Sequence, residues 1–80
     1  MRNPTSRLLL LGRPDCHLCE EFAEELRAHD PAIVLEHADV DSRADWRAAY
    51  GRRIPVLLDA AGQVICEGRF DPDRLAAGRG

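Results

Sequence analysis

The chain contains no lysine, because all eleven of its basic residues are arginines. A catalytic mechanism that forms a Schiff base on lysine is therefore excluded. Acidic residues outnumber basic ones, and the formal net charge is −3. Since non-specific binding to nucleic acid requires many cationic contacts with phosphates, we expect no nucleic-acid partner.

Cysteine and long apolar runs are also scarce. The 80 residues include three cysteines, an odd and low number compared with the disulfide frameworks of small secreted proteins. The run Leu8 to Leu11 is too short for a signal-peptide core or a membrane span. We therefore expect a cytoplasmic protein with no membrane partner. In a reducing compartment, two closely spaced cysteines are redox-active or bind metal more often than they form a permanent crosslink.

The length corresponds to one small domain, and a hydrophobic content of 45% is sufficient for a globular fold. We expect a single domain over residues 1–80, with an ordered core from about residue 7 to residue 77, and a monomer. Residues 1–6 are polar and are expected to fray.

Hydrophobic periodicity and turn residues predict the element order β-α-β-α-β-β-α. A strand–helix–strand unit is expected to form a right-handed parallel crossover. The helix and hairpin that follow complete a mixed four-stranded sheet flanked by helices, which is an α/β fold. The predicted strands are 7–11, 33–40, 56–58 and 63–67, and the predicted helices are 16–29, 42–50 and 72–77.

The first helix has a predicted apolar face with a four-residue period. Leu18, Phe22 and Leu26 form this face, and the following Asp30-Pro31 ends the helix. The glutamates of the helix are assigned to its solvent face. These are Glu20, Glu21, Glu24 and Glu25.

Local signals also predict where the other two helices begin. Ser42 and Asp45 resemble a capping box, and Asp71 is a predicted N-cap before Pro72. The inner face of the second helix is predicted to carry Trp46, Ala49 and Tyr50. Phe70 and Leu75 have the spacing of a hydrophobic staple.

The two cysteines of Cys16-His17-Leu18-Cys19 lie where the first strand gives way to the first helix. A spacing of three residues places both side chains on one side of the first helical turn, within disulfide range. The unpaired N–H groups of the helix N-terminus favour a thiolate at Cys16. Cys16 is therefore the predicted nucleophile, and the deeper Cys19 would resolve the mixed disulfide. The alternative is a pair of packed, unreactive cysteines.

Cys66, the third cysteine, lies on the last strand. By strand alternation it is expected on the same side as Val64. It is interpreted as a small buried hydrophobe, with a third redox role as the alternative. A zinc site is not expected, because a structural site needs four ligands and a distant Cys66 does not complete them.

Three segments together resemble the thioredoxin fold, and most closely the small bacterial glutaredoxin-like proteins. They are Asp15 to Cys19, the Tyr-Gly-x-Arg-Ile-Pro-Val-Leu segment at 50–57, and Phe-Asp-Pro at 70–72. The resemblance covers about residues 7–77. It implies that Pro55 is cis and that the backbone of Ile54 faces Cys16 and pairs with an extended substrate. It further implies that Gly68 and the start of the last helix line a glutathione groove.

Charged residues near the two cysteines are candidate substrate ligands. Arg13 and Arg53, with Arg52, could bind the carboxylates of glutathione, or they could form an ordinary solvated rim. His17, if protonated, would favour the thiolate, and it could equally be a surface imidazole. The predicted substrate-binding residues are Arg13, His17, Arg53, Ile54, Pro55 and Gly68.

The predicted function is a glutaredoxin-type thiol–disulfide oxidoreductase. Its predicted partners are glutathione or protein disulfides, with no bound cofactor or metal and glutathione as a possible reductant. The alternative is a binding module of the same fold, which docks a partner segment in the Ile54-Pro55 groove without turnover.

Overall fold

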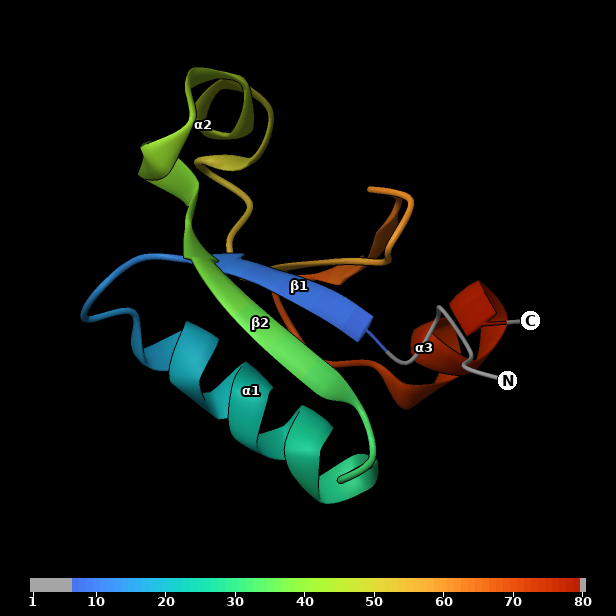
Figure 1. Ribbon diagram of the computed structural model, residues 1–80. Helices are drawn as coiled ribbons and strands as arrows, with labels where there is room; N and C mark the ends of the chain where they lie inside the picture. The colour runs from blue at the N-terminus through green and yellow to red at the C-terminus, as the bar shows by residue number, and fades with distance from the viewer. Residues whose placement is uncertain (1–6, 80) are drawn as a thin grey trace.

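The computed structural model describes residues 7–79, and the expected fraying of residues 1–6 lies outside this range. The elements follow the predicted order, with one additional 3-10 turn (Figure 1). The strands are β1 (Arg7–Gly12), β2 (Val34–Asp39), β3 (Val56–Leu58) and β4 (Val64–Glu67). The helices are α1 (His17–His29), the 3-10 turn η2 (Val40–Ser42), α2 (Ala44–Tyr50) and α3 (Pro72–Arg79).

The sheet is mixed, with the strand order β2-β1-β3-β4. β1 pairs in parallel with β2 and antiparallel with β3, which in turn forms an antiparallel hairpin with β4. The α/β fold predicted from the element order is therefore confirmed. The four leucines of β1 fit its central place, because a strand covered on both faces can be apolar throughout.

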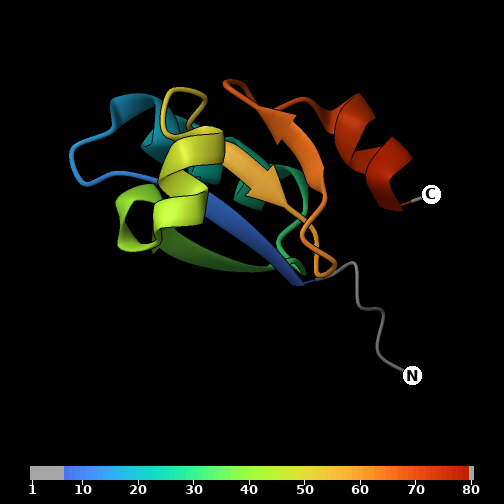
Figure 2. The same ribbon diagram turned by 90° about the horizontal axis from the view of Figure 1, so that it is seen from above.

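The helices divide between the two faces of the sheet. In Figure 2, α2 lies in front of the sheet and α1 behind it. Behind the sheet, Leu8 and Leu10 of β1 share a core with Phe22 and Leu26 of α1 and Leu75 of α3. We call this the first face.

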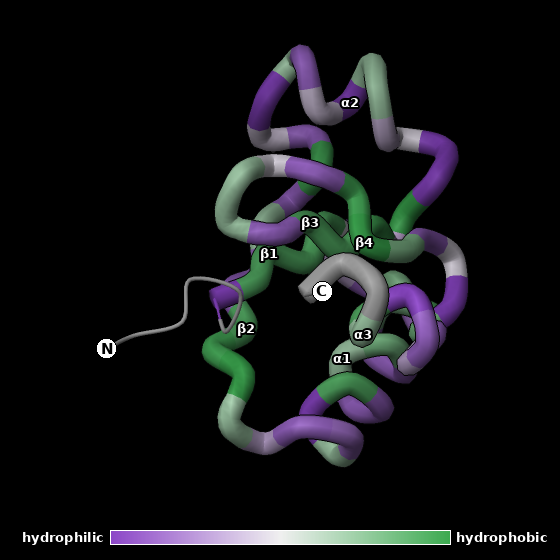
Figure 3. Tube along the Cα trace, turned by 90° about the vertical axis from the view of Figure 1, so that its right-hand side faces the viewer, coloured by the Kyte–Doolittle hydropathy of each residue, from purple (hydrophilic) through white to green (hydrophobic). Residues whose placement is uncertain are grey.

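The second face is the α2 side, and its core is smaller. Its buried residues are Leu11, Val40, Val56 and Leu58. No residue of α2 is buried, although Trp46 and Tyr50 pack partly against this core, and Ala49 of the predicted inner face is exposed. A cavity of about 610 Å³ remains between α2 and the sheet. Figure 3 shows the apolar tube concentrated in the strands, with α2 standing clear of them.

Two boundary predictions around the second helix are wrong. β2 is shorter than 33–40, because the Ile33 N–H donates to the Asp30 carbonyl within the preceding turn and Val40 begins η2. The capping box does not form, since the Ser42 hydroxyl donates to the Asp39 carbonyl and Asp45 pairs with Arg43. Short-range side-chain partners outcompete the predicted cap.

The side assignment of Cys66 is also wrong. The pairing between β3 and β4 shifts between Leu57 and Leu58, so Leu57 opposes Cys66 and Leu58 opposes Val64. The irregularity leaves Ile65 unpaired, and this extra residue breaks the strand alternation. Cys66 therefore joins the first face, whereas Val64 packs on the second.

The third helix begins as predicted. The Asp71 carboxylate accepts a hydrogen bond from the Asp73 N–H (3.0 Å), and Pro72 is the first helical residue. Phe70 and Leu75 both pack in the first-face core, as the staple spacing predicts. The helix continues to Arg79, two residues beyond the predicted end. Within residues 7–79, no helix is long and apolar enough to cross a membrane.

Candidate functional site

The two cysteines of the helix turn form a disulfide. Cys16 and Cys19 have Cα atoms 5.2 Å apart. Asp15 precedes them with a φ of 63°, a left-handed conformation that aspartate tolerates better than most residues, and it turns the chain into the helix. The sequence spacing thus places the two sulfur atoms together, as predicted.

Cys16 is the N-cap of α1, so the helix begins one residue later than predicted. Its sulfur accepts a hydrogen bond from the backbone N–H of Cys19, with an N···S distance of 3.2 Å. A thiolate at this atom would keep that donor and face the positive end of the helix dipole. Cys16 is partly exposed, whereas Cys19 is buried at 7% exposure. The two cysteines therefore differ in exposure, with Cys16 the outer and Cys19 the deeper residue, as predicted.

Gly12, at the end of β1, leaves room for the buried sulfur. A Cβ added at this position would lie 2.9 Å from Cys19 Sγ. The absence of a side chain here allows Cys19 to approach the backbone of the strand. No motif in the sequence marks this glycine as part of the site.

The Ile54-Pro55 bond is cis, as the family resemblance implies. Leu11 opposes Val56 in the sheet, and Gly12 and Pro55 are the next residues in the chain beyond this pair. Pro55 thus adjoins the strand end that contacts Cys19. Its carbonyl accepts a hydrogen bond from the N–H of Gly68 (2.8 Å), which has a φ of 78°. Gly68 is thereby tied to the proline loop in a conformation that favours glycine.

Arg13 connects the cysteine loop to the second face. Its guanidinium donates to both carboxylate oxygens of Asp41 (2.8 and 3.1 Å) and to the Gly51 carbonyl (2.8 Å). The hydrogen bond from Arg13 lowers the pKa of the Asp41 carboxyl. The same hydrogen bond raises the pKa of Arg13. Substrate binding by Arg13 stays a prediction, and a substrate carboxylate would have to compete with Asp41.

Arg53 is engaged in the same way. It forms a two-pronged ion pair with Glu67 of β4, with its Nε 2.8 Å from one carboxylate oxygen. The guanidinium also donates to the Ala49 carbonyl and lies over the Tyr50 ring. The hydrogen bond from Arg53 lowers the pKa of Glu67. Arg13 and Arg53, the two arginines predicted to bind substrate carboxylates, thus each already bind a carboxylate of this chain.

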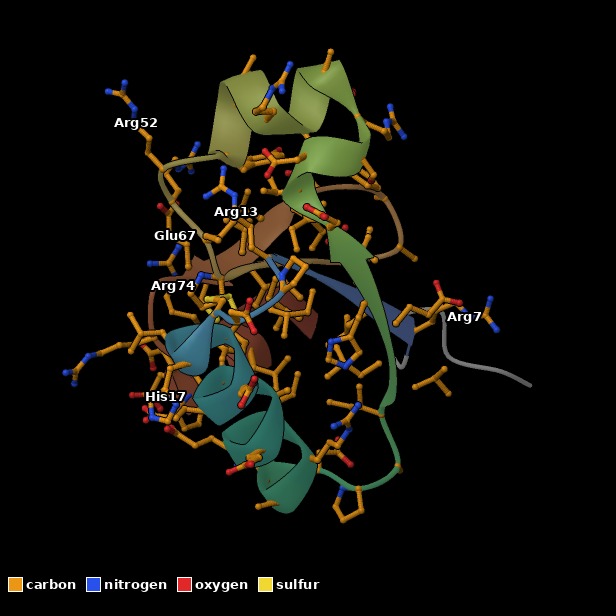
Figure 4. All side chains as sticks on the ribbon, turned by 90° about the vertical axis from the view of Figure 1, so that its left-hand side faces the viewer. Arg7, Arg13, His17, Arg52, Glu67 and Arg74 are labelled. Carbon is orange, nitrogen blue, oxygen red and sulfur yellow. A yellow bond between two sulfur atoms is a disulfide. The ribbon has the colours of Figure 1, made fainter. Side chains whose placement is uncertain are left out.

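The predicted arginine cluster does not include Arg52, which extends into solvent away from the yellow disulfide (Figure 4). His17 is exposed at the start of α1, and its Nε2 lies 2.7 Å from the carboxylate of Glu21. In the structure, His17 therefore contacts a residue of its own helix. The role predicted for His17 at the sulfur remains a prediction.

The expected inner face of α1 begins one turn later than predicted. Leu18 is 58% exposed, whereas Phe22 and Leu26 are buried. The reason is that Leu18 lies at the open end of the helix, beyond the edge of the first-face core. It lines a cavity of about 220 Å³ together with other residues of α1 and the segment 68–70. Gly68, the predicted groove residue, lies in the opposite wall.

Cys66 is buried in the first-face core at 5% exposure. Burial raises the pKa of its thiol, which disfavours the thiolate. This environment agrees with the interpretation of Cys66 as a small core residue. Among residues 7–79, no three His, Cys, Asp or Glu side chains gather as a metal-ligand set.

Sequence reasoning missed the partners that fix the charged residues. Asp41 is 28 residues from Arg13, and Glu67 is 14 residues from Arg53. No local pattern signals such pairs, because they depend on how η2 and β4 dock on the sheet.

Comparison with known proteins agrees with the geometry. Residues 7–78 match the model of the family described as "Glutaredoxin-like domain (DUF836)". The chain is similar to the solution NMR structure of protein Ne2328 from Nitrosomonas europaea, with a TM-score of 0.81 and 31% identity over 90% of this chain and 88% of that chain. It is also similar to the X-ray structure of XcR50 from X. campestris, with a TM-score of 0.68 and 39% identity over 89% and 92%. No curated protein matches it.

Proposed function

The chain belongs to the glutaredoxin-like domain family, and from this premise we propose that it is a thiol–disulfide oxidoreductase. One observation carries the proposal: the partly exposed Cys16 caps a helix and its sulfur accepts a backbone N–H, while the sulfur of the buried Cys19 lies within bonding range. That arrangement fits a redox module. We propose in addition that the protein turns over a disulfide substrate and is reduced again by a thiol donor.

In the proposed reaction, the Cys16 thiolate attacks one sulfur of a substrate disulfide. A Cys16–substrate disulfide forms, and the other substrate sulfur leaves as a thiolate that takes up a proton. The Cys19 thiolate then attacks Cys16 Sγ, which releases the second substrate thiol and forms the Cys16–Cys19 disulfide. Two electrons from a thiol donor, either glutathione or a thioredoxin-like dithiol, return the pair to the reduced state.

The remaining residues have supporting roles in this proposal. The backbone of Ile54, before the cis bond to Pro55, would pair with an extended substrate, and Gly68 would border its path. We further propose a cytoplasmic monomer that needs no bound cofactor. The buried position of Cys66 supports a mechanism with two cysteines.

The test is a disulfide reductase assay with purified protein. Cys16→Ser should abolish turnover, because it removes the attacking sulfur. Cys19→Ser should allow attack and accumulate the mixed disulfide, which mass spectrometry detects. Cys66→Ser is the matched control and should retain activity. Full activity in Cys16→Ser would refute the mechanism, and inactive wild-type protein with an ordinary thiol reactivity would favour the binding-module alternative.

A further inference from the structure

A groove beside the disulfide lies between α1 and the segment before α3. One wall is the α1 face that carries Leu18, Glu21, Phe22 and Glu25, and the other is the segment 68–70. We call this cavity of about 220 Å³ the acidic groove. It begins next to the reactive turn, since Leu18 lies between the two cysteines and Gly68 is hydrogen-bonded to Pro55.

The helix period explains the composition of this wall. Positions 18, 21, 22 and 25 have the spacing i, i+3, i+4 and i+7, which places them on one face of α1. Phe22 is buried in the core, and Glu21 and Glu25 are exposed residues that line the groove. Glu20 and Glu24 belong to the same helix and do not line the groove. The four glutamates that look alike in the sequence therefore divide into two pairs.

The charge of the groove is negative. Its described lining residues include two acidic residues, Glu21 and Glu25, and one basic residue, Arg69. Glu21 also contacts the exposed His17 imidazole. A ligand with acidic groups would meet like charge along this wall, whereas a basic segment would meet opposite charge.

The arginines on the other side of the cysteines offer little compensation. Arg13 holds both carboxylate oxygens of Asp41, and Arg53 holds both oxygens of Glu67. An acidic ligand would have to displace an ion pair to use either guanidinium. Leu18, at 58% exposure, adds an apolar contact at the mouth of the groove.

We infer that the preferred substrate is a disulfide within a protein or peptide segment that carries basic residues next to the cysteine, in preference to glutathione disulfide. This inference rests on the proposed function. The reaction is the same exchange: the reduced Cys16–Cys19 pair is oxidised to a disulfide, and one substrate disulfide is reduced to two thiols. A single turnover of pre-reduced protein needs no further reductant.

The test compares single-turnover rate constants for three oxidants. They are the disulfides of Arg-Cys-Arg and Glu-Cys-Glu peptides, and glutathione disulfide. Each rate is divided by the rate of the same oxidant with dithiothreitol, which removes differences in intrinsic disulfide reactivity. The basic peptide should react at least ~10-fold faster than the acidic one after this correction, and the ratio should shrink at high salt because exposed charges are screened.

Matched variants locate the cause. The double variant Glu21→Gln/Glu25→Gln should lower the basic-to-acidic ratio about three- to tenfold, because two charges leave the groove. Glu20→Gln/Glu24→Gln removes the same charge from the same helix and should change the ratio less than about twofold. His17→Ala separates the loss of charge from the loss of the His17 contact. It should leave the ratio high.

The outcomes distinguish this inference from the proposed function. Equal normalised rates for all three oxidants, or equal effects of the two double variants, would overturn the inference and leave the oxidoreductase intact. No exchange with any oxidant would instead refute the proposed function.

Discussion

The two faces of the sheet are stabilised by different forces. The first face packs side chains of α1 and α3 against the sheet, and Leu10 of β1 with Phe22 and Leu26 of α1 are at 2% exposure or less. On the second face, α2 buries no residue and borders a cavity of about 610 Å³. Besides its smaller core, the second face has the Arg13 contacts to Asp41 and Gly51. The helix that begins at the cysteine turn is thus held by buried side chains, whereas α2 is held by polar contacts and by the partly buried Trp46 and Tyr50.

The largest expected effect tests this difference on one strand. Leu10→Ala opens a cavity in the first-face core and should lower the free energy of unfolding by about 2–5 kcal/mol. Leu9→Ala, one residue away on the second face, should cost only about 1 kcal/mol, because Leu9 is already partly exposed beside the cavity. Urea denaturation measures both. Equal losses would show that the second face is packed as tightly as the first.

An intermediate effect is expected from two glycines. Gly12→Ala should destabilise the protein by about 1–3 kcal/mol, because the new Cβ overlaps Cys19 Sγ. It should also slow thiol–disulfide exchange by displacing the resolving sulfur. Gly62→Ala borders the second-face cavity in open space, and its φ of 84° should cost about 1–2 kcal/mol without any change in exchange rate. If Gly62→Ala slowed exchange as much as Gly12→Ala, the steric explanation would be wrong.

The smallest effect concerns acid. The Asp41 pKa lies below its ordinary value of 3.8, because Arg13 donates to the ionised form. The Asp41–Arg13 ion pair therefore contributes fully to stability at pH values above 3.8. This contribution is lost as the pH falls through the Asp41 pKa of the folded protein. Amide exchange, corrected for intrinsic rates, should show α2 losing protection before α1 as the pH falls below the ordinary Asp41 value of 3.8.

Asp41→Asn is the control for the acid experiment. Asparagine cannot ionise, so α2 should already be less protected at neutral pH and should respond less to acid. Parallel loss of protection in α1 and α2 of the wild-type protein would argue against a separate polar anchor for α2.

The elements and the cysteine turn could be predicted because their signals are local. The leucines of β1, the Asp30-Pro31 stop and the cap at Asp71 each act within a few residues. The spacing of Cys16 and Cys19 is equally local, and a single turn fixes their distance. The cis bond at Pro55 followed from the family resemblance rather than from any local preference.

The failures involve tertiary contacts. The side occupied by Cys66 depends on an irregularity between β3 and β4, which the alternating pattern does not reveal. The exposure of Leu18 depends on where the first-face core ends, and helix periodicity cannot supply that limit. The pairing of Arg13 with Asp41 joins segments that meet only after the sheet has formed.

The position of Arg13 has a further consequence for how the loop before the disulfide is held. Its guanidinium touches η2 and the end of α2 while its backbone belongs to the loop that leads into Cys16. A shift of α2 that broke the Gly51 contact would remove a tether from this loop. A single side chain therefore ties the loop before Cys16 both to η2 and to the end of α2.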